Sequence, residues 1–214
     1  MTHATTAPGD LLSDELVAAL NGLLDRVAAD LDARALVLSG AGGHFCAGAD
    51  FGRFLELMQT TPGQAEDPIA HYNRQFGALL ERVAALPVTT VAMVSGSAMG
   101  GGCGLAAACD RVIAAEDATF AMPEVTLGVA PAQIAPFVIR RTGARRARWL
   151  MLAGARLKAP AAREAGLADV VVTGGADTFA RLTHGGFNSL RASDSEPCRP
   201  FARNRTGLTT GAAT

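Results

Sequence analysis

One segment limits the possible folds of this chain more than any other: an apolar strand pattern that leads into a glycine cluster and then into an alanine-rich helix start. It covers residues 89–110, TTVAMVSGSAMGGGCGLAAACD, with consecutive glycines at Gly100, Gly101 and Gly102. Because glycine has no Cβ, the backbone N–H groups at such a helix N-terminus can face a bound group directly. The segment therefore predicts a site that holds an anion or an oxyanion through the backbone alone.

Length and composition indicate one α/β domain with a sizeable core. The chain has 214 residues, of which 49% are hydrophobic and 18% are charged, and its formal net charge is −1. That charge gives no electrostatic reason to expect binding to nucleic acid or to an anionic membrane. No segment approaches the roughly 18 apolar residues of a membrane-spanning helix, and residues 1–10 lack the pattern of a signal peptide. We therefore expect no membrane insertion and a cytoplasmic location.

The cysteines give no indication of a metal centre. Cys46, Cys103, Cys109 and Cys198 are spaced too irregularly for a zinc ribbon, and a domain of this size does not need a disulfide framework. We expect reduced cysteines that are mostly buried as small apolar residues. No metal site is predicted.

The order of the hydrophobic patterns predicts parallel strands that are joined by helices. Ser13 is placed to cap a helix with apolar residues at helical spacing up to Val27, and the apolar run 35–38 is typical of a buried parallel strand. A second helix pattern over 69–83 ends before Pro87 and leads into a strand at 89–94. Further strands are expected at 111–115, 118–121 and 167–172, and helices between 133 and 165 with breaks at Gly143, Gly154 and Pro160.

Two segments do not follow this order. The polar stretch 60–67, TTPGQAED, predicts a mobile surface loop. Residues 185–214 are rich in Gly, Ser, Thr, Arg and Asn and have neither a helical nor a strand period, so they are expected to be disordered or loosely docked. The expected organisation is a domain over residues 1–174 and an atypical, poorly ordered tail over 175–214.

A second turn has the composition of an oxyanion site. Residues 43–50, GHFCAGAD, follow the end of the predicted strand at 35–38, and their small side chains let a ligand approach the backbone. If the two strand ends are neighbours, one N–H group from each turn can converge on a single oxygen, as acyl chemistry requires. The alternative is that the glycines only form tight turns.

A carboxylate follows a short strand in the sequence Ala121-Met122-Pro123-Glu124. A glutamate beside an apolar wall is a candidate general acid or base. The alternative is a solvated or helix-capping carboxylate, which is the commoner role of a glutamate in such a position.

The blocks HFCAGADF, VSGSAMGGGCGLAAACD and FAMPEVTLGVAP, in this order and spacing, resemble the crotonase superfamily, the enoyl-CoA hydratases and isomerases. The resemblance spans Leu11 to Val172. It implies an α/β fold, the crotonase-like (ClpP/crotonase) fold of repeated ββα units. The strands that precede the first long helix in that family, and its C-terminal helices, are expected to be missing or altered here.

The resemblance implies an acyl-CoA thioester as substrate and partner, with coenzyme A as part of the substrate and no other cofactor. Ala47 and Gly101 would donate their N–H groups to the thioester oxygen of an enolate, and Glu124 would be the acid or base. The family pattern also implies a homotrimer or hexamer. The residues that it assigns to substrate binding are Cys46, Ala47, Gly48, Ala49, Asp50, Gly100, Gly101 and Gly104.

The chain departs from the best-known hydratases at Gly104, where they carry the first of two catalytic glutamates. A single carboxylate favours an isomerase, because one base can move a proton between two carbons. The stretch 129–138, however, resembles glutaconyl-type hydratases of branched acyl-CoAs and favours hydration of an enoyl-CoA. Two alternatives stay open: a truncated, inactive relative, and a dinucleotide-binding oxidoreductase, since Gly102 to Ala107 formally match a short fingerprint with Glu124 as a ribose contact.

Overall fold

The computed structural model describes most of the first 174 residues. The described ranges are 2–8, 11–49, 56, 68–174 and 178–179. The loop expected at 60–67 lies outside them, and so does the predicted tail apart from Thr178 and Phe179.

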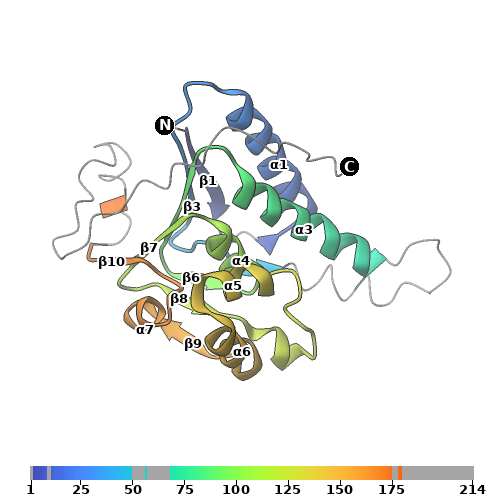
Figure 1. Cartoon of the computed structure of the whole chain (residues 1–214), viewed down its shortest axis with the longest axis vertical. Coiled ribbons are helices and arrows are strands. Elements are labelled where there is room, and N and C mark those ends of the chain that lie inside the picture. The colour runs from blue at the N-terminus through green and yellow to red at the C-terminus, as the bar shows by residue number, and fades with distance from the viewer. Residues whose placement is uncertain (1, 9–10, 50–55, 57–67, 175–177, 180–214) are drawn as a thin grey trace, which may run out of the picture.

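A five-stranded parallel sheet forms the centre of the domain (Figure 1). Its strand order is β1-β3-β5-β7-β10, with β1 at Thr2–Pro8, β3 at Ala35–Ala41, β5 at Thr89–Val94, β7 at Arg111–Ala115 and β10 at Val170–Val172. The central strands are buried on both faces, which explains why their sequences are continuous apolar runs. Leu36 and Leu38 contact the main core, while Val37 between them contributes to a smaller cluster on the other face that includes Phe179.

Three helices pack together against one face of this sheet. They are α1 (Asp14–Ala29), α3 (Pro68–Ala85) and α4 (Gly101–Ala108), and α1 and α3 run side by side in Figure 1. Ser13 caps α1 as predicted, because its hydroxyl accepts a hydrogen bond from the N–H of Leu16. The side chains of α1 at helical spacing, Val17, Leu20, Leu24 and Val27, are buried as their pattern indicated.

Two smaller sheets lie beside the main one. In the first, β2 (Leu11–Leu12) pairs parallel with β4 (Gly48–Ala49). In the second, β6 (Ser97–Met99) pairs parallel with β8 (Thr119–Ala121), which pairs antiparallel with β9 (Arg156–Lys158). These short strands were not expected, except for β8, since two or three residues are too few to show a period.

The second half of the chain contains short helices separated by glycines. They are η1 (Pro123–Leu127), α5 (Ala135–Thr142), α6 (Ala144–Ala153) and α7 (Ala159–Glu164). The predicted breaks at Gly143 and Gly154 are confirmed, and both residues have positive φ angles, 77° and 56°. Pro160 does not break a helix. It lies in the first turn of α7, where the missing N–H has no cost.

The strands before the first long helix were expected to be missing or altered, and the structure shows two strands there. β1 pairs in parallel with β3 in the register Thr2 to Leu36, and β2 follows directly before α1. The sequence of β1, THATTAP, has no apolar alternation. It extends the sheet through backbone hydrogen bonds to the edge of β3, and backbone pairing leaves no mark in a hydrophobicity pattern.

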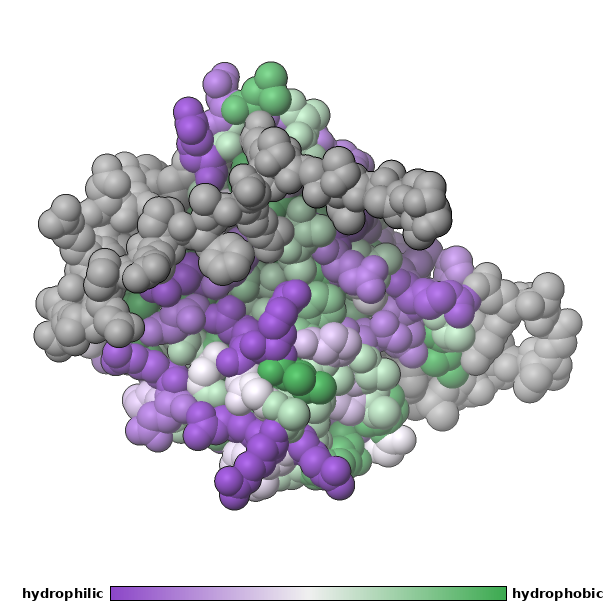
Figure 2. All heavy atoms as spheres, viewed as in Figure 1, coloured by the Kyte–Doolittle hydropathy of each residue, from purple (hydrophilic) through white to green (hydrophobic). Residues whose placement is uncertain are grey.

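On the face of the domain shown in Figure 2, hydrophilic and hydrophobic residues lie side by side. Cys46, Cys103 and Cys109 are buried and free, as expected, while Cys198 lies outside the described residues. Among the described helices, none combines the length and the apolar character needed to cross a bilayer.

Candidate active site

The turn around Cys46 lies directly against the start of α4. The N–H of Cys46 donates to the carbonyl of Ser97 at 3.0 Å, and the N–H of Met99 donates to the carbonyl of Cys46 at 3.0 Å. A Cβ on Gly102 would lie 2.7 Å from Cβ of Cys46 and 2.8 Å from its carbonyl oxygen. Glycine at position 102 therefore permits the contact that brings the two predicted turns together.

Gly100 sets the direction of the backbone at the start of α4. Its dihedral angles, φ 50° and ψ −118°, belong to a region that side chains disfavour, and its N–H donates to the carbonyl of Ala121 at 2.8 Å. The next residue, Gly101, begins the helix, so its N–H lies at the positive end of the helix dipole. Among the described residues, no acceptor bonds the N–H of Gly101 or that of Ala47.

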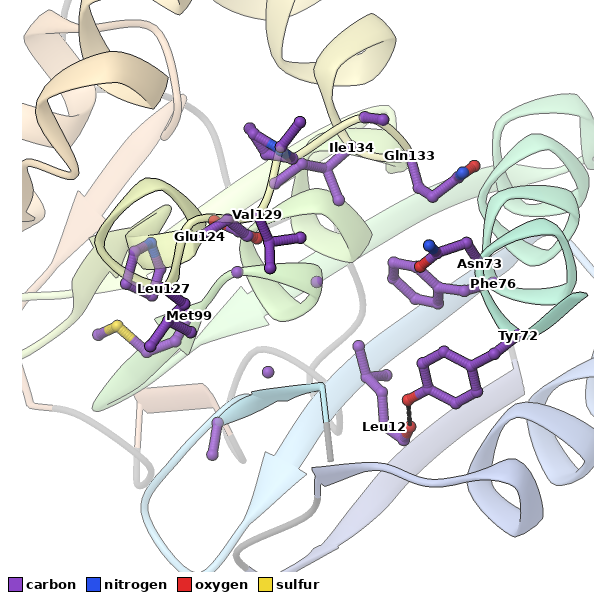
Figure 3. A pocket seen from close by; sticks show the side chains of 18 residues that line it. Leu12, Tyr72, Asn73, Phe76, Met99, Glu124, Leu127, Val129, Gln133 and Ile134 are labelled. Atoms are coloured by element: carbon purple, nitrogen blue, oxygen red, sulfur yellow. Dashed lines mark hydrogen bonds between the residues drawn. The ribbon is translucent and has the colours of Figure 1, made fainter. Parts of the chain in front are cut away.

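Ala47 and Gly101 both line one cavity of about 290 Å³. Figure 3 shows side chains that line this cavity, Glu124 among them. The cavity lies between the two turns, helix α3, helix η1 and the segment that follows η1. Its larger apolar side chains include Leu12, Phe76, Met99, Leu127, Val129 and Ile134. Glu124 is the one charged side chain among the described residues that line it.

Glu124 is a half-buried carboxylate at this cavity. Its Oε1 lies 2.8 Å from the point where a Cβ on Gly100 would sit, and its buried Oε2 has no hydrogen-bond partner in the described part of the chain. Burial raises the pKa of the carboxyl above its ordinary value of 4.5, although a backbone hydrogen bond acts in the opposite direction. A carboxyl group with a raised pKa at an apolar cavity is a candidate general acid or base.

Some of the other predicted binding residues line the cavity, and others lie behind it or in the small sheet beside it. Gly48 and Gly100 line the cavity, and Gly48, with φ 103°, allows the carbonyl of Met99 to approach within 2.9 Å of its missing Cβ. Cys46 is buried behind the cavity, and Ala49 pairs with Leu12 in the small sheet. Asp50 lies outside the described residues.

Gly104 does not line the cavity. Its missing Cβ would lie 2.6 Å from Cβ of Ile134, and Cγ2 of Ile134 would be nearer still. Ile134 is itself buried and contributes to the cavity wall. Hydratases with two catalytic glutamates would carry the first glutamate at position 104. In this chain the side chain of Ile134, from a later segment, fills the space beside that position.

The sequence did not identify the wall that α3 contributes. Tyr72, Asn73 and Phe76 line the cavity from this helix, and Gln133 lines it from the opposite segment. The hydroxyl of Tyr72 donates to the carbonyl of Leu12 at 2.8 Å and so holds α3 against β2 (Figure 3). The sequence offered one signal for this wall: polar residues beside Phe76 on an amphipathic helix. The same pattern is also typical of a helix whose polar face is exposed to water.

The sequence model of the enoyl-CoA hydratase/isomerase family matches residues 7–181. The chain belongs to this family. A solved enoyl-CoA hydratase/isomerase from Marinobacter aquaeolei is 39% identical, with a TM-score of 0.76, and the match covers 82% of this chain and 67% of that one. The Pseudomonas aeruginosa protein AtuE is 41% identical with a TM-score of 0.75, over 82% of this chain and 66% of the other. The expected crotonase-like α/β fold is confirmed.

Curated relatives of this family are longer than this chain. The 2,3-dehydroadipyl-CoA hydratase of Escherichia coli is 34% identical over 168 residues, which are 78% of this chain and 62% of the relative. The enoyl-CoA hydratase AFT6-1 of Alternaria alternata is 36% identical over 163 residues, 76% of this chain and 51% of the relative. The chain thus spans between half and two thirds of the length of these relatives.

The dinucleotide interpretation does not fit the geometry. Residues 102–107 lie inside α4, and every one of them is buried. A dinucleotide fingerprint needs its first glycines in the turn between a strand and a helix, where the pyrophosphate approaches the backbone. In this chain that turn is occupied by the short strand β6 and by Gly100.

Proposed function

We propose that this chain carries the acyl-CoA site of an enoyl-CoA hydratase. The observation that supports this most is the presence of three groups on one cavity: the backbone at Ala47, the backbone at Gly101 and the carboxylate of Glu124. Two N–H groups and a carboxylate at an apolar cavity are the components needed to stabilise and protonate a thioester enolate.

The two backbone turns would act on the thioester oxygen. When a nucleophile adds to an α,β-unsaturated thioester, negative charge develops on that oxygen as the enolate forms. The N–H groups of Ala47 and Gly101 would donate to it, and the dipole of α4 would add to the effect at Gly101. The loss of one such donor costs about 2.7–4 kcal/mol of transition-state stabilisation in comparable sites.

Glu124 would transfer the protons in sequence. As the carboxylate, it takes a proton from water while the water oxygen forms a bond to the β-carbon and the double-bond electrons move to the thioester oxygen. As the carboxylic acid, it then returns the proton to the α-carbon when the enolate collapses. The net change is the addition of one water molecule, and the carboxylate is restored.

An isomerase is the second candidate, and the contact between Gly104 and Ile134 favours it. Because Ile134 fills the space beside Gly104, no second carboxylate stands there. Glu124 alone could remove a proton from one carbon and return it two carbons away. We place hydration first because the stretch 129–138 resembles glutaconyl-type hydratases, and because a similar protein is a hydratase of 2,3-dehydroadipyl-CoA, whose acyl chain carries a free carboxylate besides the thioester. A branched or dicarboxylic enoyl-CoA is therefore the proposed substrate.

The decisive experiment is a spectrophotometric assay of the purified chain on 2-enoyl-CoA and 3-enoyl-CoA thioesters. Hydration removes the conjugated absorbance, whereas isomerisation of the 3-enoyl compounds creates it. Glu124→Gln should lower turnover by about 10²–10⁴-fold. Glu116→Gln, at an exposed glutamate, is the matched control and should leave turnover unchanged. Full activity of Glu124→Gln would refute the proposal, and thioester binding without turnover by the unaltered chain would favour an inactive relative.

The proposal also covers the cofactor, the assembly and the location of the protein. Coenzyme A is part of the substrate and no other cofactor takes part. The proposed assembly is a homotrimer or hexamer in the cytoplasm, and sedimentation of the purified chain at several concentrations tests the assembly. A monomer at all concentrations would contradict it.

A further inference from the structure

The cavity has a polar wall that the proposed chemistry does not use. On the side of α3, Asn73 lines the cavity as a half-buried residue, and so does Gln133 from the segment after η1. Figure 3 shows both side chains on the side of the cavity away from Glu124. Neither amide has a hydrogen-bond partner in the part of the chain that the structure describes.

The side chain of Gln133 packs against the face of α3 that carries Asn73. The side-chain amide of Gln133 packs against Gly77 of α3, where its Cδ would lie 3.3 Å from a Cβ on that glycine. Gly77 follows Asn73 by four residues, so the two positions are neighbours on one face of the helix, about 5–6 Å apart between Cβ atoms. The missing side chain at Gly77 thus lets the amide of Gln133 reach the helix one turn from Asn73.

This wall is not suited to a plain hydrocarbon chain. Each primary amide carries two N–H donors and one carbonyl acceptor. If a hydrocarbon covered them, N–H donors would be buried without partners, which is unfavourable. The rest of the cavity lining is mostly apolar, so it offers little alternative bonding to these groups.

We propose that Asn73 and Gln133 form an amide pair that binds an oxygen acceptor on the acyl group, at a position remote from the thioester. This proposal rests on the acyl-CoA site described above. It names the substrate class: enoyl thioesters whose acyl chain carries a carboxylate or a carbonyl. No lysine or arginine is among the described residues that line the cavity, so the amide N–H groups would supply the recognition.

The test uses saturated thioesters, because they bind without reacting and so separate this proposal from the proposed activity. Calorimetry compares hexanoyl-CoA, adipyl-CoA and 5-oxohexanoyl-CoA, which have acyl chains of equal length. The chain should bind one or both of the oxygenated compounds at least 10-fold more tightly than hexanoyl-CoA. Tighter binding of adipyl-CoA indicates recognition of a carboxylate, and tighter binding of 5-oxohexanoyl-CoA indicates recognition of a carbonyl. Equal affinity for all three would overturn the amide pair even if enoyl-CoA turnover is observed.

Variants then assign the preference to the two residues. Asn73→Leu and Gln133→Leu should each reduce the preference for the oxygenated compound by about 5-fold or more. The oxygenated compound loses an N–H donor, whereas hexanoyl-CoA no longer buries an unpaired amide and should bind at least as tightly as before. Gln75→Leu, which removes an exposed amide on the same helix, should leave the preference unchanged. Retained binding of hexanoyl-CoA shows that the variants are folded. A preference that survives in both leucine variants would overturn the assignment.

Discussion

Ile134 occupies the space that a side chain on Gly104 would need: a Cβ at position 104 would lie 2.6 Å from Cβ of Ile134. Gly104 is on α4, within the stretch that carries the oxyanion turn, whereas Ile134 comes directly before α5. Position 104 therefore does more than lack a carboxylate, because Ile134 packs into the space beside the glycine. A glutamate could be introduced at position 104 only together with a smaller residue at position 134.

Gly104→Ala should therefore destabilise the fold, although alanine is the better helix former. Overpacking of this kind costs about 1–3 kcal/mol, and chemical denaturation with urea measures it. In an Ile134→Ala background the same substitution should cost much less, because the space is then free. Gly22→Ala in α1 is the control: its Cβ would meet only Arg26 Nη1 at 3.7 Å, so the variant should gain up to about 1 kcal/mol. Additive effects of the Gly104 and Ile134 substitutions would contradict the packing explanation.

Glu124 should make both stability and activity depend on pH. Burial raises its pKa in the folded chain above 4.5, so between 4.5 and the raised value the folded chain holds a proton that the unfolded chain releases. The stabilising contribution is complete below the unfolded pKa and is lost as the pH rises through the folded pKa. Relative to Glu124→Gln, the unaltered chain should lose stability as the pH rises through this window, and urea titrations at several pH values test the sign.

The same pKa sets the acid limit of activity. Because the ionised carboxylate is the base, kcat/KM should fall as the pH drops through the raised pKa, at a higher pH than an ordinary glutamate would give. A pH profile of kcat/KM on the best enoyl-CoA measures this limit. An acid limb at or below 4.5 would show that Glu124 is not the titrating base.

Gly100→Ala should affect catalysis as well as stability. Gly100 and Gly143 both have backbone angles that favour glycine, with φ 50° and ψ −118° at the first and φ 77° and ψ 154° at the second. Alanine at either position should cost about 1–3 kcal/mol in backbone strain. Only at Gly100 would the Cβ meet Oε1 of Glu124, at 2.8 Å, whereas nothing lies within 4 Å at Gly143. A comparison of turnover should show a loss of at least 10-fold for Gly100→Ala alone, and equal turnover in the two variants would contradict the contact.

Arg141 joins α5 to two strand ends. It donates to the carbonyl of Cys109 at 3.0 Å and to Oδ2 of Asp169 at 2.5 Å, and the same oxygen accepts from the N–H of Val112 at 2.6 Å. The two side chains of this pair are only 10% and 28% exposed. Arg141→Met should cost about 2 kcal/mol or more, because a largely buried carboxylate loses its cation.

The exposed pair of Arg82 and Asp25 provides the comparison. Their side chains are 39% and 72% exposed, so water screens the attraction between them. Arg82→Met should cost less than about 1 kcal/mol in the same urea titration. If Arg82→Met lowered the free energy of unfolding more than Arg141→Met, burial would not determine how much these pairs contribute to stability.

The hydrophobic patterns identified the long elements well and the short ones poorly. The helices α1 and α3 and the strands β5 and β7 agree with the predicted ranges to within a few residues, because each has a period or an apolar run that depends on its own sequence. The strand β3 extends to Ala41, past the predicted end at 38, since backbone pairing with its neighbours continues there. The strand β10 begins only at Val170, later than predicted. The strands β1, β2, β4, β6 and β9 were missed, because backbone pairing and not a side-chain pattern defines them.

The two glycine-rich turns, the carboxylate of Glu124 and the order of the long helices and central strands could be predicted from the amino-acid sequence, because those features depend on local chemistry and on residues close together in the chain. Which of these features meet depends on the tertiary structure. It placed Ala47, Gly101 and Glu124 on one cavity, put Ile134 into the space beside Gly104, and brought the amide of Gln133 to the face of α3 that carries Asn73. Each of these contacts joins side chains or backbone from distant segments, and only the packing of strands and helices against one another fixes such distances.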